Sequence, residues 1–346
     1  MERGIYLCKY MKKTLSLLIL AGAMASLLVS CTGKSTVPST KKEIMDSFVA
    51  GTLDPSYAPA AFFIHFGADQ KLGDTAVQAH LDYFRESGMD ILKVQFEQTA
   101  PRITDLGNCE AELIPEDFYR PTLEVITRLQ EAEGADTYVL PTLYNTYQVA
   151  RASMGEERIK TAAVEQPQQL KTVFDSYRDA LLWLVRECKK AGIQGFYMCT
   201  QGGEMTFHDI PGFFETYIRA YDMAVMEECT RDTKMNILHI CNWEGPYDDL
   251  TRYKDYPAQI VNTPNNLNGK PFTLSDGIQL FGRPVLGGFD RKGAVNTMSD
   301  EEVATATREI LDSAPAGRVM IGADCTVGSA PVANIKAAVA SAHGSF

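Results

Sequence analysis

The sequence predicts an α/β fold, a closed (β/α)8 barrel of eight parallel strands, each followed by a helix. Short apolar, β-prone runs alternate with longer segments of helical period from Ala60 onward, and eight of each can be counted. The hydrophobic content of 45% and the charged content of 22% are typical of a globular chain with ample material for a core. No glycine-rich dinucleotide fingerprint follows the first strand, which weakens the alternative of an open doubly wound sheet.

The helical segments carry apolar residues on one face, as the side chains of 170–188 illustrate, and Ser299 with Glu302 forms a capping box that opens a late helix. Two connections that follow strands are long, 97–115 and 144–166. Because barrel active sites are built from such loops, we expect the site at the carboxyl ends of the strands. The expected strands are 62–66, 91–96, 137–143, 195–199, 236–241, 259–262, 284–289 and 319–323.

The N-terminus has the pattern of an export signal. Lys12 and Lys13 precede the apolar run 14–28, which is too short to span a bilayer comfortably. The run ends in Leu28-Val-Ser-Cys31, which looks like the lipobox of bacterial lipoproteins, where the Cys is lipidated and becomes the new N-terminus. The alternative is a buried N-terminal helix that happens to contain Cys31.

Three regions follow from this interpretation. We expect a lipoprotein signal peptide at 1–30, a lipidated, flexible tether at 31–59 and the barrel at 60–346. The protein would then be lipid-anchored to the bacterial cell envelope, at the outer membrane or periplasmic face. The net charge of −11 and the absence of a Lys/Arg stripe predict no nucleic-acid partner, and contact with the membrane through the lipid anchor alone.

Two strand ends carry potential metal ligands. His239 and Cys241 end the fifth expected strand two positions apart, so both side chains point to the same face, and Cys325 follows the eighth. Thiolate and imidazole ligands favour zinc, and three protein ligands with an open fourth position are typical of catalytic zinc. The sulfurs of Cys241 and Cys325 should then lie about 3.5–4 Å apart. Alternatively, the cysteines are small buried hydrophobic residues beside a core histidine, or they form a disulfide.

Three segments resemble the uroporphyrinogen decarboxylase superfamily: Gly282–Asp290, the helix start Asp300–Val303, and Gly322–Ser329. The superfamily includes cobalamin-dependent methyltransferases that methylate thiols such as coenzyme M. In that branch a His-x-Cys on the fifth strand and a Cys after the eighth bind catalytic zinc. The resemblance therefore implies that His239, Cys241 and Cys325 bind zinc, with cobalamin as the methyl donor.

The decarboxylase branch fits the sequence less well. Its members carry an Arg-rich segment near the first strand and a catalytic Asp after the second. Here the first strand and its continuation, 62–70, contain no Arg, and Glu97 stands near the place of the Asp. Export also departs from both branches, whose familiar members are cytoplasmic.

Other polar residues near strand ends are candidate site residues. Glu204, Asp290 and Glu97 are the catalytic candidates, with Glu204 also a possible fourth zinc ligand. The alternatives are a solvated loop carboxylate at Glu204, a loop cap or a partner of Arg291 at Asp290, and a plain loop residue at Glu97. The expected substrate contacts are His65, Trp243 and Gly288. His65 could equally be a hydrogen-bonded residue of the rim, and Trp243 could be packing.

Three functions remain open from the sequence. The first is zinc-dependent methyl transfer to a small thiol, which the potential ligand trio favours. The second is decarboxylation of uroporphyrinogen or another tetrapyrrole, which only the overall resemblance favours. The third is a non-catalytic lipoprotein that captures a corrinoid, a porphyrin or a thiol compound, which export favours.

The lipobox interpretation makes a direct prediction. Cys31→Ala should leave the precursor unprocessed or release the protein from the membrane fraction, because the thiol that carries the lipid is gone. Metabolic labelling with an alkyne fatty acid, followed by fractionation, measures this. Unlabelled wild-type protein in the cytoplasm would remove both the lipoprotein interpretation and the location.

Overall fold

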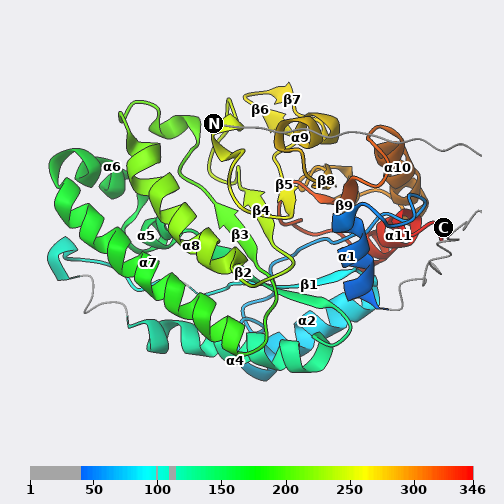
Figure 1. The fold of residues 1–346 in the computed structure, drawn as a ribbon, viewed down its shortest axis with the longest axis horizontal. Coiled ribbons are helices and arrows are strands. Elements are labelled where there is room, and N and C mark those ends of the chain that lie inside the picture. The colour runs from blue at the N-terminus through cyan, green and yellow to red at the C-terminus, as the bar shows by residue number, and fades with distance from the viewer. Residues whose placement is uncertain (1–39, 99, 109–113, 346) are drawn as a thin grey trace, which may run out of the picture. The chain divides into compact units, whose positions relative to one another are not determined.

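A computed structural model of the chain describes residues 40–98, 100–108 and 114–345. The expected signal peptide and Cys31 therefore lie outside the described residues. At the centre is a curled sheet of seven parallel strands in the order β1-β2-β3-β4-β5-β8-β9, and helices cover its outer side (Figure 1). Every strand of this sheet pairs in parallel with its neighbour, so the carboxyl ends of all seven strands lie at the same end of the sheet.

Seven of the eight expected strands are present, within a few residues of their expected bounds. The strands are β1 (Ile91–Val94), β2 (Tyr138–Tyr144), β3 (Tyr197–Thr200), β4 (Ile237–Ile240), β5 (Ile260–Asn262), β8 (Val285–Phe289) and β9 (Val319–Ala323). A small antiparallel hairpin, β6 (Asn266–Leu267) and β7 (Lys270–Pro271), is inserted after β5. The helices are α1 (Lys41–Ala50), α2 (Gly73–Ser87), α4 (Pro115–Glu133), α5 (Thr146–Met154), α6 (Glu156–Glu165), α7 (Pro167–Lys190), α8 (Ala220–Thr230), α9 (Leu274–Phe281), α10 (Asp300–Asp312) and α11 (Val332–Ala342).

The expected first strand, 62–66, is not a strand in the structure. The chain just before it runs beside β9 and forms one isolated parallel bridge, between Ala60 and Ile321. On the β1 side one backbone bond forms, from the N–H of Asp90 to the Ala60 carbonyl oxygen at 3.0 Å. The N–H groups of this segment bond to side chains instead, that of Ala60 to the Asp90 carboxylate (2.8 Å) and that of Phe62 to the Met89 sulfur (2.9 Å). These contacts hold residues 59–63 between β9 and β1 without forming a regular ladder.

The chain is folded well before residue 60, although the sequence analysis placed 31–59 in a tether. Helix α1 begins at a capping box in which the Thr40 hydroxyl accepts from the N–H of Glu43, and it ends at Gly51 in a left-handed conformation. Met45 and Phe48 of α1 are fully buried. The apolar face of α1 explains the difference, since a helix that buries such side chains is stabilised by the body it packs against.

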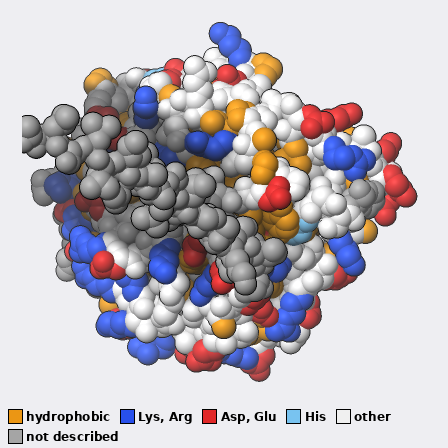
Figure 2. Space-filling view, turned by 45° about the vertical axis from the view of Figure 1, so that its right-hand side comes forward, with side chains coloured by type: hydrophobic (Ala, Val, Ile, Leu, Met, Phe, Trp, Pro, Cys, Tyr) orange, Lys and Arg blue, Asp and Glu red, His pale blue; other side chains and the backbone are white. Residues whose placement is uncertain are grey.

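The amphipathic helices bury the faces that the sequence predicts. The apolar face of α7 includes Leu170, Phe174 and Leu184, all essentially inaccessible to solvent. The expected capping box of α10 is confirmed, because the Ser299 hydroxyl accepts from the N–H of Glu302 at 3.3 Å. No helix within the described residues is long and apolar enough to cross a bilayer. On the face drawn in Figure 2, acidic and basic side chains are interspersed.

The close approach of residues 59–63 to β9 can be tested at Gly322. A Cβ atom there would lie 2.5 Å from the Ala61 carbonyl oxygen and 2.6 Å from a methyl group of Leu286. Gly322→Ala should therefore lower the free energy of unfolding by about 1–3 kcal/mol, as measured by urea denaturation. Gly328→Ala is the matched control, because a Cβ there meets no atom within 4 Å. Equal stability of the two variants would contradict the packing of this segment on β9.

Candidate metal centre

The register of β3 and β4 brings cysteine and histidine side chains together. Cys199 of β3 pairs directly with His239 of β4, and Cys241 lies two residues beyond His239 on the same face. The potential ligand atoms of these three residues all lie within 4.8 Å of one another, and all three side chains are buried. The side chains at the carboxyl ends of two adjacent strands thus form a compact group of thiol and imidazole donors.

Cys325 joins this group from the loop after β9. Its sulfur lies 4.0 Å from that of Cys241, at the upper end of the spacing expected for two ligands of one metal ion, and both are free thiols. The hydrogen bond to Cys241 and burial raise the pKa of Cys325 to about 12. The hydrogen bond to Cys199 likewise raises the pKa of Cys241 well above its ordinary value. Without a metal ion the thiols of Cys241 and Cys325 are therefore protonated at neutral pH.

The His239 imidazole is buried without a hydrogen bond. Its side chain is 2% exposed, and neither ring nitrogen has a hydrogen-bond partner among the described residues. Tyr197 stacks on the ring, with centroids 5.3 Å apart, and fixes its orientation. A buried imidazole with two unused nitrogens is costly unless something binds there, so this arrangement fits a metal ligand.

Arg291 connects the two loops that carry cysteines. Its Nη1 donates to Asn242, next to Cys241, at 2.6 Å and to Asp324, next to Cys325, at 2.9 Å. The backbone N–H of Arg291 also donates to the Asp324 carboxylate at 2.7 Å. The guanidinium and the carboxylate are both buried. This charged pair holds the loops after β4 and β9 in the positions that bring the two sulfurs together.

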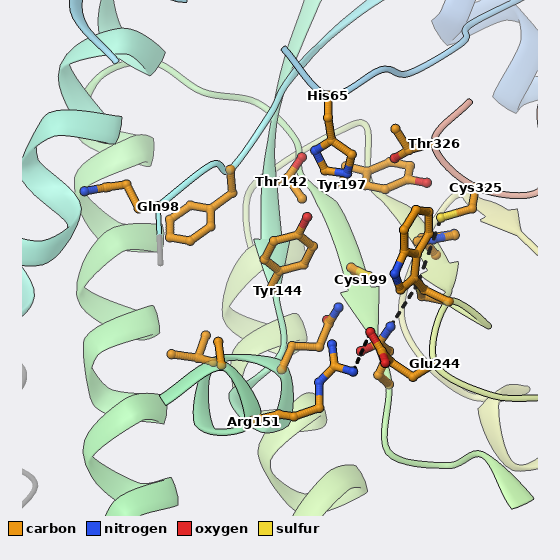
Figure 3. Close-up of a pocket in the computed structure, with 18 of the residues that line it drawn as sticks. His65, Gln98, Thr142, Tyr144, Arg151, Tyr197, Cys199, Glu244, Cys325 and Thr326 are labelled. Carbon is orange, nitrogen blue, oxygen red and sulfur yellow. Dashed lines mark hydrogen bonds and ion pairs between the residues drawn. The ribbon is translucent and has the colours of Figure 1, made fainter. Parts of the chain in front are cut away.

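The cluster forms one wall of a cavity of about 300 Å³ at the carboxyl ends of the strands (Figure 3). Figure 3 shows Tyr144, Cys199 and Cys325 facing this space, with His65 at one end and the ion pair of Arg151 and Glu244 at the other. The lining mixes aromatic, polar and thiol side chains: His65, Lys93, Phe96, Gln98, Phe118, Thr142, Tyr144, Gln148, Arg151, Tyr197, Cys199, Gln201, His239, Cys241, Trp243, Glu244 and Cys325.

A buried cation lies beside the thiols. Lys93, in the middle of β1, is 8% exposed and donates to the Gln95 side chain at 2.7 Å. Its ammonium group lies 4.8 Å from the ring centroid of Tyr197 and 4.9 Å from that of Phe63. Burial lowers its pKa to about 8, while the neighbouring cysteines, foremost Cys325, act in the opposite direction. Lys93 therefore carries most of a positive charge at neutral pH.

Two of the candidate residues form a hydrogen bond at the rim. His65 Nδ1 lies 2.9 Å from Glu97 Oε1, and Lys71 lies 4.0 Å from the other carboxylate oxygen. Burial acts to raise the pKa of Glu97, but the hydrogen bond and charge of His65, with Lys71, lower it overall. His65 lines the cavity, and Glu97 stays ionised behind it as its partner.

Trp243 stands at the solvent edge of the cavity. Its side chain is 51% exposed, and the Arg291 guanidinium lies 5.3 Å from its ring. The indole is therefore held by a cation–π contact while most of one face remains open. Trp243 lines the cavity, and its contact with a substrate stays a prediction.

Three of the candidate residues lie away from this cavity. Glu204 is fully buried, and its carboxylate accepts from the N–H of Gly202 at 2.5 Å. Asp290 is exposed and accepts from the N–H of Lys292 at 2.8 Å, which makes it a cap of its loop. Gly288 lines a different cavity on the side of α9 and α10. The structure thus separates these three residues from the cavity that the ligand cluster lines.

Sequence reasoning did not single out Cys199, Lys93 or Tyr197. The sequence position of Cys199 could have identified it, since it lies at the carboxyl end of a strand, as His239 does. Lys93 could also have been identified, because a charged residue inside the apolar run Ile91–Val94 is unusual. No sequence feature identifies Tyr197, since aromatic residues are common in buried strands.

The comparisons with known proteins establish the fold. No protein-family model matches the chain, and no curated protein matches it. A methyltransferase from Methanosarcina mazei is similar in structure, with a TM-score of 0.70, 14% identity, and coverage of 88% of this chain and 98% of that one. A B12-independent methionine synthase from Shewanella sp. W3-18-1, in complex with selenomethionine, gives a TM-score of 0.55, 12% identity, and coverage of 83% and 97%. At such identities the likeness shows the fold alone.

Glu204 gives a prediction on stability. Burial raises its pKa to about 7. A carboxyl group whose folded-state pKa is raised contributes stability that is complete at acidic pH and is lost as the pH rises through about 7. Glu204→Gln should therefore exceed wild type in unfolding free energy by up to about 3 kcal/mol near pH 8.5, with a smaller difference near pH 5.

Denaturant unfolding at the two pH values measures this difference. The exposed Glu309 supplies the control, because Glu309→Gln should track wild type at both. A Glu204→Gln variant whose difference from wild type is independent of pH would show that the carboxyl group is not buried as described.

Proposed function

We propose that this protein is a zinc-dependent methyltransferase that acts on a small thiol. We further propose that residues 59–63 complete an eight-stranded barrel. We also propose that the mature chain is lipid-anchored at the bacterial cell envelope. The observation that carries the functional proposal is the buried cluster of His239, Cys241 and Cys325 at the wall of a cavity. These are the residues at which the resemblance noted in the sequence implies zinc ligands.

The cluster has the properties that a zinc site requires. His239 offers two ring nitrogens that have no partner within the described residues, and the two sulfurs lie 4.0 Å apart as free thiols. Imidazole and thiolate donors favour zinc over harder cations. Zinc bound there would lower the pKa of a substrate thiol, so that the nucleophilic thiolate forms at neutral pH.

The surrounding residues suit a thiol substrate. The positive charge of Lys93 favours thiolates in the adjacent cavity, because an opposite charge nearby stabilises the ionised form. Arg291 holds the loops that carry Cys241 and Cys325. Trp243 offers an open aromatic face at the entrance. These residues bind, orient and partly enclose a substrate whose sulfur points to the cluster.

The size of the cavity suits a small thiol substrate. About 300 Å³ lies at the lower end of the range for small-molecule sites. Two structural neighbours are, by name, a methyltransferase and a methionine synthase, which agrees with the proposed chemistry. In the reaction a carbon–sulfur bond forms as the bond between the methyl group and its donor breaks, and the thiol proton leaves to solvent. The resemblance implies methylcobalamin as the donor.

Metal binding and methyl transfer should fail together when a ligand is removed. His239→Ala, Cys241→Ala and Cys325→Ala should each lose stoichiometric zinc, measured by elemental analysis, and methyl transfer from methylcobalamin to small thiols such as coenzyme M. Cys229→Ala, which removes a buried thiol in α8, is the control and should retain both.

Two results would overturn this function. One is a reduced, correctly folded and zinc-free protein that still methylates its thiol. The other is loss of carbon dioxide from a porphyrinogen, which would establish the decarboxylase alternative. Tight binding of a corrinoid or porphyrin with neither activity would establish the binding lipoprotein.

A further inference from the structure

A third cysteine belongs to the geometry of the cluster. Cys199 lies at the carboxyl end of β3, paired in register with His239, so its side chain faces the same cavity. Its side chain is 2% exposed. Cys199, Cys241 and Cys325 form a buried group of their own, set apart from the main hydrophobic core and packed against Tyr144. A cysteine that served only as core packing would be expected in the main core, as Cys188 and Cys229 are.

The distances place the Cys199 sulfur near two of the other potential donors. Its sulfur, the nearer His239 nitrogen and the Cys241 sulfur are mutually within 4.8 Å. Cys241 in turn lies 4.0 Å from Cys325. To bind one tetrahedral ion, with bonds to sulfur of about 2.3 Å, the four side chains would have to rotate toward one another.

The other polar groups near the cluster each have a hydrogen-bond partner for at least one side-chain atom. The Gln201 side-chain amide donates to the Cys241 sulfur at 3.2 Å, so it supports the thiolate and does not compete for a metal ion. The Asp324 carboxylate is bound by Arg291. Glu204, the fourth ligand that the sequence suggested, bonds to Gly202 outside the cavity. Cys199 is thus the donor best placed to complete the site.

We propose that Cys199 is a fourth protein ligand, so that the centre is a Cys3His site formed by Cys199, His239, Cys241 and Cys325. This inference rests on the proposed zinc site and goes beyond it. Three thiolates around a divalent zinc ion leave one net negative charge, which a buried site must balance. Lys93, which forms no salt bridge within the described part of the chain, supplies that charge from the same cavity.

The ligand set has a consequence for substrate binding. A site with four protein ligands is coordinatively closed, whereas one with three keeps an open position. A substrate sulfur that binds zinc would therefore have to displace one protein donor or expand the coordination.

Zinc K-edge X-ray absorption on the purified, zinc-loaded protein tests the assignment without measuring activity. Wild type should show three sulfurs and one nitrogen around zinc, and Cys199→Ser should show two sulfurs. Competition with a chelator should show that zinc affinity falls by about tenfold or more in Cys199→Ser, since even changes to residues that only support a ligand have effects of that size. Cys188→Ser, a buried thiol of α7 outside the cluster, should match wild type in both measurements.

The outcomes separate this inference from the proposed function. Stoichiometric zinc with only two sulfurs in wild type would overturn the role of Cys199 and leave the site of three ligands intact, and this result does not depend on how the variant folds. Unchanged affinity and sulfur count in Cys199→Ser would do the same. A wild-type protein that binds no zinc would overturn the proposed function and this inference together.

Discussion

The parallel alignment of β3, β4 and β9 is the constraint on which the site depends. Because all strands run the same way, their carboxyl ends meet at one edge, and the residues that end them become neighbours although they are far apart in the sequence. Cys199 and His239 are brought together by a direct register pair. Shifting either strand by one residue would turn its side chain to the opposite face and separate the donors.

A buried ion pair positions the loops that carry Cys241 and Cys325. The Arg291–Asp324 pair ties the loop after β9 to the loop after β4, so Cys325 approaches Cys241 although no ladder connects those loops. A buried ion pair of this kind contributes little net stability, because desolvation of both charges offsets their attraction. Its value here lies in position, since hydrogen bonds to a planar guanidinium fix the loops in a single geometry.

The site also shows how similar residues take different roles through their surroundings. Glu97 and Glu204 both follow strands, yet Glu97 is ionised through its contacts with His65 and Lys71, whereas burial raises the pKa of Glu204. Cys188 and Cys199 are equally buried, but one packs in the main core and the other faces a cavity beside His239. Residue type alone therefore does not identify the functional groups of this protein.

The sequence by itself determined the alternation of strands and helices, the capping box of α10 and the placement of His239, Cys241 and Cys325 at strand ends. These features follow from local periodicity and from the two-residue repeat of a strand, which neighbouring residues specify. Only the tertiary structure decided that Cys199 joins the cluster, that Lys93 lies beside it and that Glu204 points elsewhere. It also decided that residues 59–63 contact β9 through a single bridge and that α1 belongs to the folded body. Contacts between distant parts of the chain set the strand register, the paths of the loops and side-chain acceptors such as Asp90. A local sequence pattern therefore cannot predict them.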